Sequence, residues 1–277
     1  MKILKIMIVL LILTLSVGAV CAAENSTSDV LSADSQEVLE ITPNEVYSTG
    51  DASFSDLKDE IDNASTYLEL TKDYAFNNET DDDTGIFITK SNFVLNGEGH
   101  TIDAKFQSRI FVITGNNITI CNLNLINGNK TGEFGGAINS TGTLTLNDII
   151  FNNNHAGNGG ALYIGGETTI NNALFSENKA GNGGAILIQG ETEINNVTFN
   201  NNQADAGGAL YIDGETTIND SIFNNNNATN GGAILAQDEA KINNSTFNNN
   251  QAENGEAIFN KNYQCRQVDF FILSLYF

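Results

Sequence analysis

A repeat of 24 residues constrains this chain more than any other feature of its sequence. The step is kept by a glycine column, Gly135, Gly159, Gly183, Gly207, Gly231 and Gly255. It is also kept by a phenylalanine column, Phe151, Phe175, Phe199, Phe223 and Phe247, and by an asparagine column, Asn154, Asn178, Asn202, Asn226 and Asn250. A fixed period of roughly 20–50 residues indicates a solenoid, in which each unit buries its apolar side against the next unit.

Each unit contains three short β-strand-like segments, and these predict the fold class. In one unit they are residues 159–164, 167–172 and 173–180. We therefore expect an all-β fold, a parallel β-helix in which every strand pairs with its copy about 4.8 Å away in the next unit. The general preference of parallel crossovers predicts a right-handed coil.

The period also predicts which side chains stack inside the coil. Three columns are expected to point inward, namely Leu162, Ile186, Leu210 and Ile234, then Ile170, Ile194, Ile218 and Ile242, and then the phenylalanines. The asparagine column is expected at a corner, where its amides bond along the stack and where asparagine tolerates left-handed backbone. The paired glycines are expected to serve the same corner or to let two backbones approach closely. Residues 110–134 form a looser copy, in which Ile126 and Asn129 precede Phe151 and Asn154 by 25 residues.

The N-terminal region predicts export and a covering element. Residues 1–23 combine a basic start, an apolar run and small residues, as in a secretory signal peptide, and an uncleaved anchor is the alternative. Residues 24–50 form a flexible acidic linker. Residues 51–85 form an N-terminal cap of helix plus strand, in which Ser53 and Asp56 make a capping-box pair. Phe54, Leu57, Ile61 and Ala64 share one face of this amphipathic capping helix.

The remaining chain divides at the end of the repeat. Residues 86–260 form the β-helix of 24-residue coils, and residues 261–277 form a hydrophobic tail without repeat. This tail either folds over the C-terminal opening or is the product of a truncation or frame shift. Cys121 and Cys265 lie six coils apart, about 29 Å along the axis, so we do not expect them to pair with each other unless the tail folds back.

The charge balance narrows the classes of partner. With 12 basic and 34 acidic residues, the net charge of -22 repels nucleic acid and anionic lipid. Beyond the signal, no segment is apolar over a length that spans a bilayer. No cofactor is expected.

Two outward rows are candidate binding sites. Tyr163, Leu187, Tyr211, Leu235 and Phe259 alternate with inward aliphatics, so Tyr163, Tyr211 and Phe259 are candidates for stacking on a glycan. The alternative is that outward apolar residues simply suit a sheet surface. Glu167, Glu191, Glu215 and Glu239 form a row that either holds divalent cations or is a solvated turn, and we favour the turn. Candidate glycosylation sites are the sequons at Asn25, Asn63, Asn78 and Asn117.

Enzymatic function is the main alternative, because β-helices also host polysaccharide lyases and hydrolases. The nearest candidate constellation is His100, Asp103 and Arg109, which we interpret as part of an ordinary early coil. Hydrolysis needs a carboxylate pair around the bond, and active sites interrupt local regularity, whereas these repeats are nearly uniform. We therefore expect a non-enzymatic protein.

Two motifs carry a family resemblance. Gly183–Ile186 (GGAI) and Phe199–Asn202 (FxxN) resemble the polymorphic outer membrane protein repeats of chlamydial adhesins and autotransporters. Residues 53–64, 72–77, 95–104 and 108–113 resemble the adhesin-like surface proteins of methanogenic archaea. The resemblance covers roughly residues 50–260 and implies a right-handed β-helix, display at the cell surface and attachment to other cells or to surface polysaccharide. A structural surface spacer is a further alternative.

Overall fold

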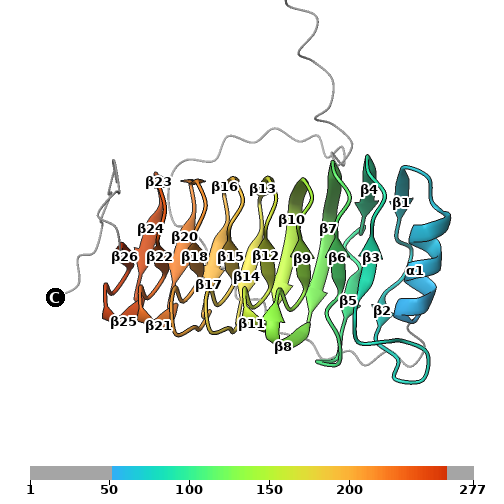
Figure 1. Cartoon of the computed structure of the whole chain (residues 1–277), viewed down its shortest axis with the longest axis horizontal. Coiled ribbons are helices and arrows are strands. Elements are labelled where there is room, and N and C mark those ends of the chain that lie inside the picture. The colour runs from blue at the N-terminus through green and yellow to red at the C-terminus, as the bar shows by residue number, and fades with distance from the viewer. Residues whose placement is uncertain (1–51, 261–277) are drawn as a thin grey trace, which may run out of the picture. The chain divides into compact units, whose positions relative to one another are not determined.

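The computed structural model describes residues 52–260, which form a stack of parallel β-coils. The strand pairings are parallel throughout these residues, which confirms the all-β parallel β-helix, while its handedness stays a prediction. The expected signal peptide, linker and tail, together with Asn25 and Cys265, lie outside the described residues. One helix, α1 (Phe54–Asn63), lies at the N-terminal end of the stack (Figure 1). No helix in the described part is long and apolar enough to cross a membrane.

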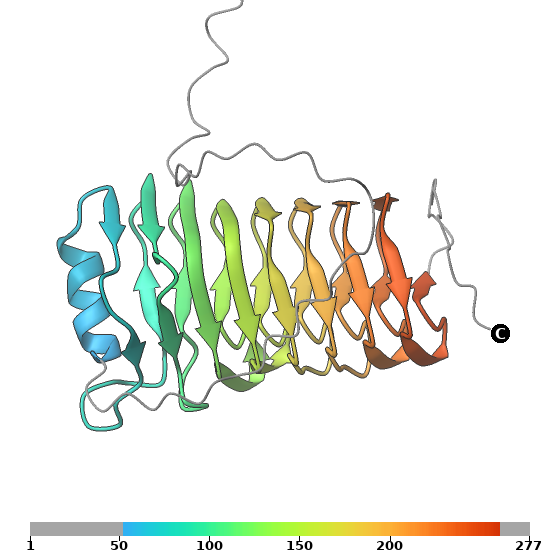
Figure 2. The ribbon, with the colours of Figure 1, turned by 180° about the vertical axis from the view of Figure 1, so that it is seen from behind.

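The strands form two large sheets and two small ones (Figures 1 and 2). Sheet A has fourteen strands: β1 (Tyr67–Glu69), β2 (Tyr74–Ala75), β4 (Phe93–Asn96), β5 (Thr101–Asp103), β7 (Ile118–Ile126), β10 (Leu144–Asn152), β13 (Thr168–Asn171), β14 (Leu174–Ser176), β16 (Thr192–Asn195), β17 (Thr198–Asn200), β19 (Thr216–Asn219), β20 (Ile222–Asn224), β23 (Ala240–Asn243) and β24 (Thr246–Asn248). Sheet B has eight strands: β3 (Ile86–Ile88), β6 (Phe111–Ile113), β9 (Ile138–Ser140), β12 (Leu162–Ile164), β15 (Ile186–Ile188), β18 (Leu210–Ile212), β22 (Ile234–Ala236) and β26 (Ile258–Asn260). The small sheets pair β8 (Asn129–Phe134) with β11 (His155–Asn158), and β21 (Asn227–Asn230) with β25 (Gln251–Asn254).

The interior columns follow the predicted period. Leu162 pairs with Ile186, and Ile186 pairs with Leu210, in the register of one coil per repeat. The aliphatic members of both columns are buried, and so are four of the phenylalanines. Adjacent phenylalanine rings from Phe151 to Phe247 are stacked, with centroids 4.5 to 5.2 Å apart. Burial of each such side chain contributes about 1.5–3 kcal/mol, so the repeat is a packing device.

The predicted register of residues 110–134 is wrong by one residue. Phe151 pairs with Leu125, and Asn152 pairs with Ile126, so the step on this strand is 26. Leu125 is fully buried, whereas Ile126 is half-buried on the outer side. A slip of one residue reverses the side of every side chain on a strand, so only one register places the leucine in the core. The same shift puts Gly128 where later coils have the buried asparagine.

The inner asparagine column, Asn154, Asn178, Asn202, Asn226 and Asn250, forms a continuous ladder of hydrogen bonds. In each pair, for example Asn178 and Asn202, the backbone N–H and Nδ2 of the first residue both donate to Oδ1 of the second, each at 3.0 Å. Nδ2 of Asn202 also donates to the Phe175 carbonyl at 2.9 Å. The first four members of this column are buried. The column therefore satisfies buried backbone groups that the corner leaves without a strand partner.

The left-handed corner residues are not the asparagines that we expected. Positive φ occurs one residue earlier, as at Glu177 (57°) and Asn201 (55°). The buried asparagines lie one residue after the positive-φ residue, where the side-chain amide of each bonds to the next member of the inner asparagine column. The paired glycines divide the two expected roles. Gly183 has a φ of 62°, and a Cβ at its neighbour Gly184 would lie 2.1 Å from the Gly208 carbonyl oxygen of the next coil.

The helix at the N-terminal end forms where its sequence predicts. Ser53 and Asp56 make the capping box, and Phe54, Leu57 and Ile61 are buried in the core cluster. Ala64 lies just past the last turn, in extended conformation. The Asp81 carboxylate accepts hydrogen bonds from the backbone N–H groups of Phe54 and Ser55 at 3.0 and 2.9 Å. These bonds satisfy helix N–H groups that have no partner within the helix.

Candidate functional site

An apolar stripe runs along the outer surface of sheet B. The register places these residues opposite one another from strand to strand: Phe87, Val112, Asn139, Tyr163, Leu187, Tyr211, Leu235 and Phe259. Asn139 is the one polar member of this row. The residues on either side of Phe87 and of Tyr163 are buried, which shows that the row faces outward. The three candidate glycan-binding residues thus lie in one straight line across the sheet.

Phe134 packs against Tyr163, the member of the stripe that follows Asn139. Its ring lies 4.7 Å from the ring of Tyr163, and its side chain is 42% exposed. The buried Arg109 holds this segment, because its Nη2 donates to the Phe134 carbonyl at 2.6 Å and its Nε donates to the Gly135 carbonyl at 2.8 Å. Burial lowers the pKa of Arg109, and the Glu133 carboxylate partly offsets this effect. Arg109 therefore orders an aromatic pair on the surface.

The two tyrosines of the stripe differ in their neighbours. The hydroxyl of Tyr163 donates to Oε1 of Gln189 at 2.7 Å, so the amide lies beside the ring. Burial and the nearby Asp213 carboxylate raise the pKa of Tyr211. Since a raised pKa keeps the phenol protonated, Tyr211 remains a neutral hydrogen-bond donor around neutral pH.

The stripe is less exposed at the leucines between its aromatic residues than we expected. Leu187 is 5% exposed and Leu235 is 6% exposed, whereas Tyr163, Tyr211 and Phe259 are half-buried. The residues on both sides of Tyr163 and Tyr211 remain fully buried. The leucines are shorter than the aromatic residues one rung above and below them, so the exposed apolar surface belongs mainly to the rings.

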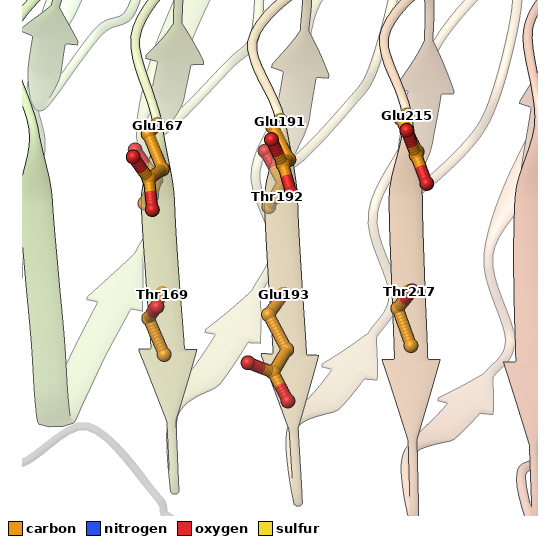
Figure 3. A pocket seen from close by; sticks show the side chains of 8 residues that line it. Glu167, Thr169, Glu191, Thr192, Glu193, Glu215 and Thr217 are labelled. Atoms are coloured by element: carbon orange, nitrogen blue, oxygen red, sulfur yellow. The ribbon is translucent and has the colours of Figure 1, made fainter.

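The glutamate row lies immediately before strands β13, β16, β19 and β23 of sheet A. Glu167, Glu191 and Glu215 line a shallow hollow together with an outer row of Thr169, Glu193 and Thr217 on β13, β16 and β19 (Figure 3). Glu239 does not line this hollow. Beyond it, Lys241 Nζ lies 3.9 Å from Glu215 Oε1, with both side chains at least half exposed. Among residues 52–260, no group of three or more histidine, cysteine, aspartate or glutamate side chains is placed to hold a metal ion.

Outer asparagines add a second ladder to this sheet. Asn147, Asn171, Asn195, Asn219 and Asn243 form the outer asparagine column, in which each Nδ2 donates to Oδ1 of the preceding coil at 2.8 to 3.0 Å. The corresponding position one coil earlier is occupied by Cys121, which pairs with Asn147. Since Cys265 lies outside the described residues, the expectation that it does not pair with Cys121 stays a prediction.

The structure does not bring the weak catalytic constellation together. His100 Nδ1 lies 3.0 Å from Asp73 Oδ1, while Asp103 accepts from Asn127 Nδ2 at 2.9 Å. Arg109 is engaged with carbonyl groups and Glu133, as described above. Each of the three side chains has its own structural partner, which agrees with the interpretation as an ordinary early coil.

The candidate glycosylation sites within the described residues are exposed. Asn63 is the last residue of α1, and Asn78 lies between β2 and β3. Asn117 donates from Nδ2 to Asn92 Oδ1 at 2.8 Å, so a glycan on this nitrogen has to replace that bond. Their modification stays a prediction.

Several exposed aromatic residues were missed by the sequence reasoning. Phe87 is 45% exposed at one end of the stripe, and Phe106 is 38% exposed with its ring 5.4 Å from that of His155. Burial, and to a lesser extent Lys179, lower the pKa of His155. Phe87 could have been found from the alternation in residues 86–88. Phe106 lies in a turn between β5 and β6, and Phe134 ends β8, whose register with β11 shifts before Asn158.

The fold and its columns define a parallel β-solenoid built from 24-residue repeats. The Chlamydia polymorphic membrane protein repeat model matches four segments of this region, residues 148–165, 172–189, 196–213 and 220–237, so these repeats are similar to that family's repeats. Each matched segment contains one residue of the inner asparagine column and one glycine pair. The four glutamates of the row lie outside the matched segments. No curated protein and no solved structure matches the chain.

Proposed function

We propose that this chain is an exported, non-enzymatic, adhesin-like protein of the cell surface. In this proposal it attaches to other cells or to surface polysaccharide through the outer face of sheet B. Tyr163, Tyr211 and Phe259 stack on sugar rings, which present apolar faces to aromatic side chains.

One observation carries the proposal, namely the outward row of sheet B, in which every member except Asn139 is apolar and in which partly exposed aromatic rings recur. The rows of sheet A around the hollow present glutamate, threonine and asparagine, and the other outward rows of this sheet include half-buried aliphatic residues such as Leu174 and Ile222. Sheet B differs in placing Tyr163, Tyr211 and Phe259 on one outward row in register. Concave or flat sites that combine aromatic faces with a few polar groups are typical of small-molecule and sugar binding. A purely structural spacer gives no reason for aromatic residues to recur in register along one row.

The matched repeats support display at a surface, because the family that they define is named for membrane proteins. The resemblance of residues 53–113 to the adhesin-like proteins of methanogenic archaea, and the predicted signal peptide 1–23, agree with export. The net charge of -22 supports partners other than nucleic acid and anionic lipid.

Binding by the purified mature chain, residues 24–277, to a glycan array and to whole cells tests the proposal. We expect the Tyr163→Ala, Tyr211→Ala double variant to lose binding by about tenfold or more, since each ring contributes on the order of 1 kcal/mol. The matched control is Thr169→Ala, Thr217→Ala, which changes outward residues in the same two coils on sheet A. Equal binding by both double variants contradicts the proposal.

The same purified chain also tests the two alternative functions, an enzyme that cleaves polysaccharide and a structural spacer. Release of reducing ends from a panel of polysaccharides is the outcome expected of a β-helical lyase or hydrolase, and it contradicts the non-enzymatic part of the proposal. Absence of binding to any glycan or cell, in a correctly folded sample, favours a structural surface spacer.

A further inference from the structure

The length of the apolar stripe sets the size of what it binds. It crosses all eight strands of sheet B, from Phe87 on β3 to Phe259 on β26. Seven intervals of about 4.8 Å give a stripe about 34 Å long. It is only one residue wide on each strand, because the residues on both sides of Tyr163 and Tyr211 are buried. A compact ligand covers one part of such a line, and only a long, thin ligand covers all of it.

The exposed area argues against a folded protein or a second copy of this chain as the occupant. A fully exposed aromatic side chain presents about 200 Å², so the partly exposed rings of the stripe and Phe134 present roughly 300–400 Å² in total. A stable protein interface buries about 800 Å² on each partner. The stripe instead matches the largest apolar patch of an ordinary monomer, which is often functional.

The absence of charge on the stripe residues indicates whether a long, thin ligand is anionic, cationic or uncharged. None of the eight members of the row is charged, and neither is Phe134. The next outward positions after Tyr163, Leu187, Tyr211 and Leu235 are Gly165, Gln189, Asp213 and Gln237. In a chain with a net charge of -22, this surface repels polyanions, and it lacks the rows of carboxylates that a polycation needs. An uncharged polymer is therefore the complementary partner.

Polar groups beside the rings provide the hydrogen bonds that a sugar polymer requires. Gln189 is exposed, and its Oε1 accepts from the Tyr163 hydroxyl, so ring and amide are held together. Asn139 interrupts the apolar row where Phe134 lies against Tyr163. An alternation of ring faces and amides along one line suits sugars, which have apolar faces and hydroxyl edges.

We propose that the stripe binds a linear, uncharged polysaccharide whose chain runs along the solenoid axis across the strands of sheet B. This inference rests on the proposed glycan-binding function and specifies its ligand class and its direction. The Tyr163, Tyr211 and Phe134 rings form the centre of the site, and Phe87 and Phe259 form its ends. Each additional sugar that reaches a further rung adds contact, so affinity grows with chain length.

The test measures Kd for the mature chain with neutral β-1,4-linked oligosaccharides of two to eight units, built from glucose, mannose, xylose or N-acetylglucosamine. Polygalacturonate is the acidic comparison. We expect at least one neutral series to gain affinity up to the length that covers the stripe, by about tenfold or more in total. Phe87→Ala and Phe259→Ala should each weaken the longest ligand about 3- to 10-fold and leave the shortest nearly unchanged. Tyr211→Ala should weaken both.

Melting temperatures of the variants control for folding, and Thr169→Ala, Thr217→Ala is the matched surface control. Affinity that does not depend on length, or end variants without effect on the longest ligand, overturns this inference and leaves glycan binding intact. Preference for polygalacturonate also overturns it. Attachment to cells without affinity for any neutral series overturns the ligand class but not adhesion. Absence of binding to every glycan and cell contradicts both proposals.

Discussion

The N-terminal coils and the repeated coils of this solenoid are stabilised by different kinds of interaction. Within residues 52–260, the ion pairs lie between residues 58 and 133, with the exception of Lys241 with Glu215. The repeated coils rely on the stacked phenylalanines and on the two asparagine columns. These interactions recur with every turn, and neither column contains a group that titrates. The repeated coils therefore depend on stacking and hydrogen bonds that are present in every coil, whereas the N-terminal coils depend on single ion pairs.

A single substitution in the inner asparagine column should cause the largest loss of stability in the repeated coils. Asn202→Ala leaves the buried N–H of Asn178 and the carbonyl of Phe175 without their side-chain partners. Because an unsatisfied buried polar group costs about 1–3 kcal/mol, we expect the free energy of unfolding to fall by roughly 2–5 kcal/mol. Urea unfolding followed by circular dichroism measures this loss.

The outer asparagine column supplies the matched control. Asn195→Ala, at the end of β16 in the same coil, removes bonds to Asn171 and Asn219 at a half-buried surface where water replaces them. We expect a loss of about 1 kcal/mol or less. Equal losses for the two variants would mean that burial does not distinguish the columns.

A glycine where neighbouring coils approach closely should give a smaller loss of stability when it is substituted. Gly184→Ala places a Cβ 2.1 Å from the Gly208 carbonyl oxygen, so the two coils have to move apart. We expect a loss of about 1–3 kcal/mol, the usual range for overpacking. In Gly165→Ala the nearest atom, at 3.2 Å, belongs to the Tyr163 side chain, which can move. A loss for Gly165→Ala as large as that for Gly184→Ala contradicts the steric explanation.

Acid should weaken the N-terminal end before the repeated coils. Burial raises the pKa of Asp81, but hydrogen bonds from Asn77, Ser55 and Phe54 outweigh it and leave the pKa below the ordinary value of 3.8. Its stabilising contribution is therefore complete above this value and is lost as the pH falls through the lower, folded-state pKa. We expect Asp81→Asn to cost about 1–2 kcal/mol at pH 7, discounted for partial exposure.

Hydrogen exchange at successively lower pH measures which end opens first. Protection should decrease in α1 while the amides around Asn178 and Asn202 remain protected. In Asp81→Asn the loss in α1 should depend less on pH. Simultaneous opening of both regions in the native chain contradicts a separate, ionisation-dependent N-terminal end.

The one ion pair of the repeated coils should contribute least. Lys241 and Glu215 are half exposed and 3.9 Å apart, so Lys241→Ala should cost about 0.5 kcal/mol or less. The glutamate row beside it should not respond to cations, and the melting temperature should be the same in Ca²⁺ and in chelator. A clear rise in melting temperature with Ca²⁺ would indicate a cation site in this row and contradict the solvated turn.

Much of the repeated region could be predicted because equal intervals in the sequence become equal heights in the stack. The columns of Leu162, Phe175 and Asn178 follow from this rule, as does the outward row of Tyr163. The corner backbone did not follow from it, because a period aligns equivalent residues but does not say which of two neighbours takes a positive φ. Glu177 and Asn201 take it, and the adjacent asparagines are thereby directed inward.

The sequence by itself determined the parallel solenoid, its 24-residue period and the identity of its inner columns, because stacking requires identical positions to repeat. Only the tertiary structure decided the register of residues 110–134, the place of Phe134 against Tyr163 and the burial of Leu187. Coils that depart from the 24-residue step, and strands such as β8 whose register shifts, are not aligned by the period. Their positions depend on contacts such as those of Arg109 with the Phe134 and Gly135 carbonyls. The stripe on sheet B, with its exposed rings and buried leucines, arises from this combination of repeated and unrepeated residues.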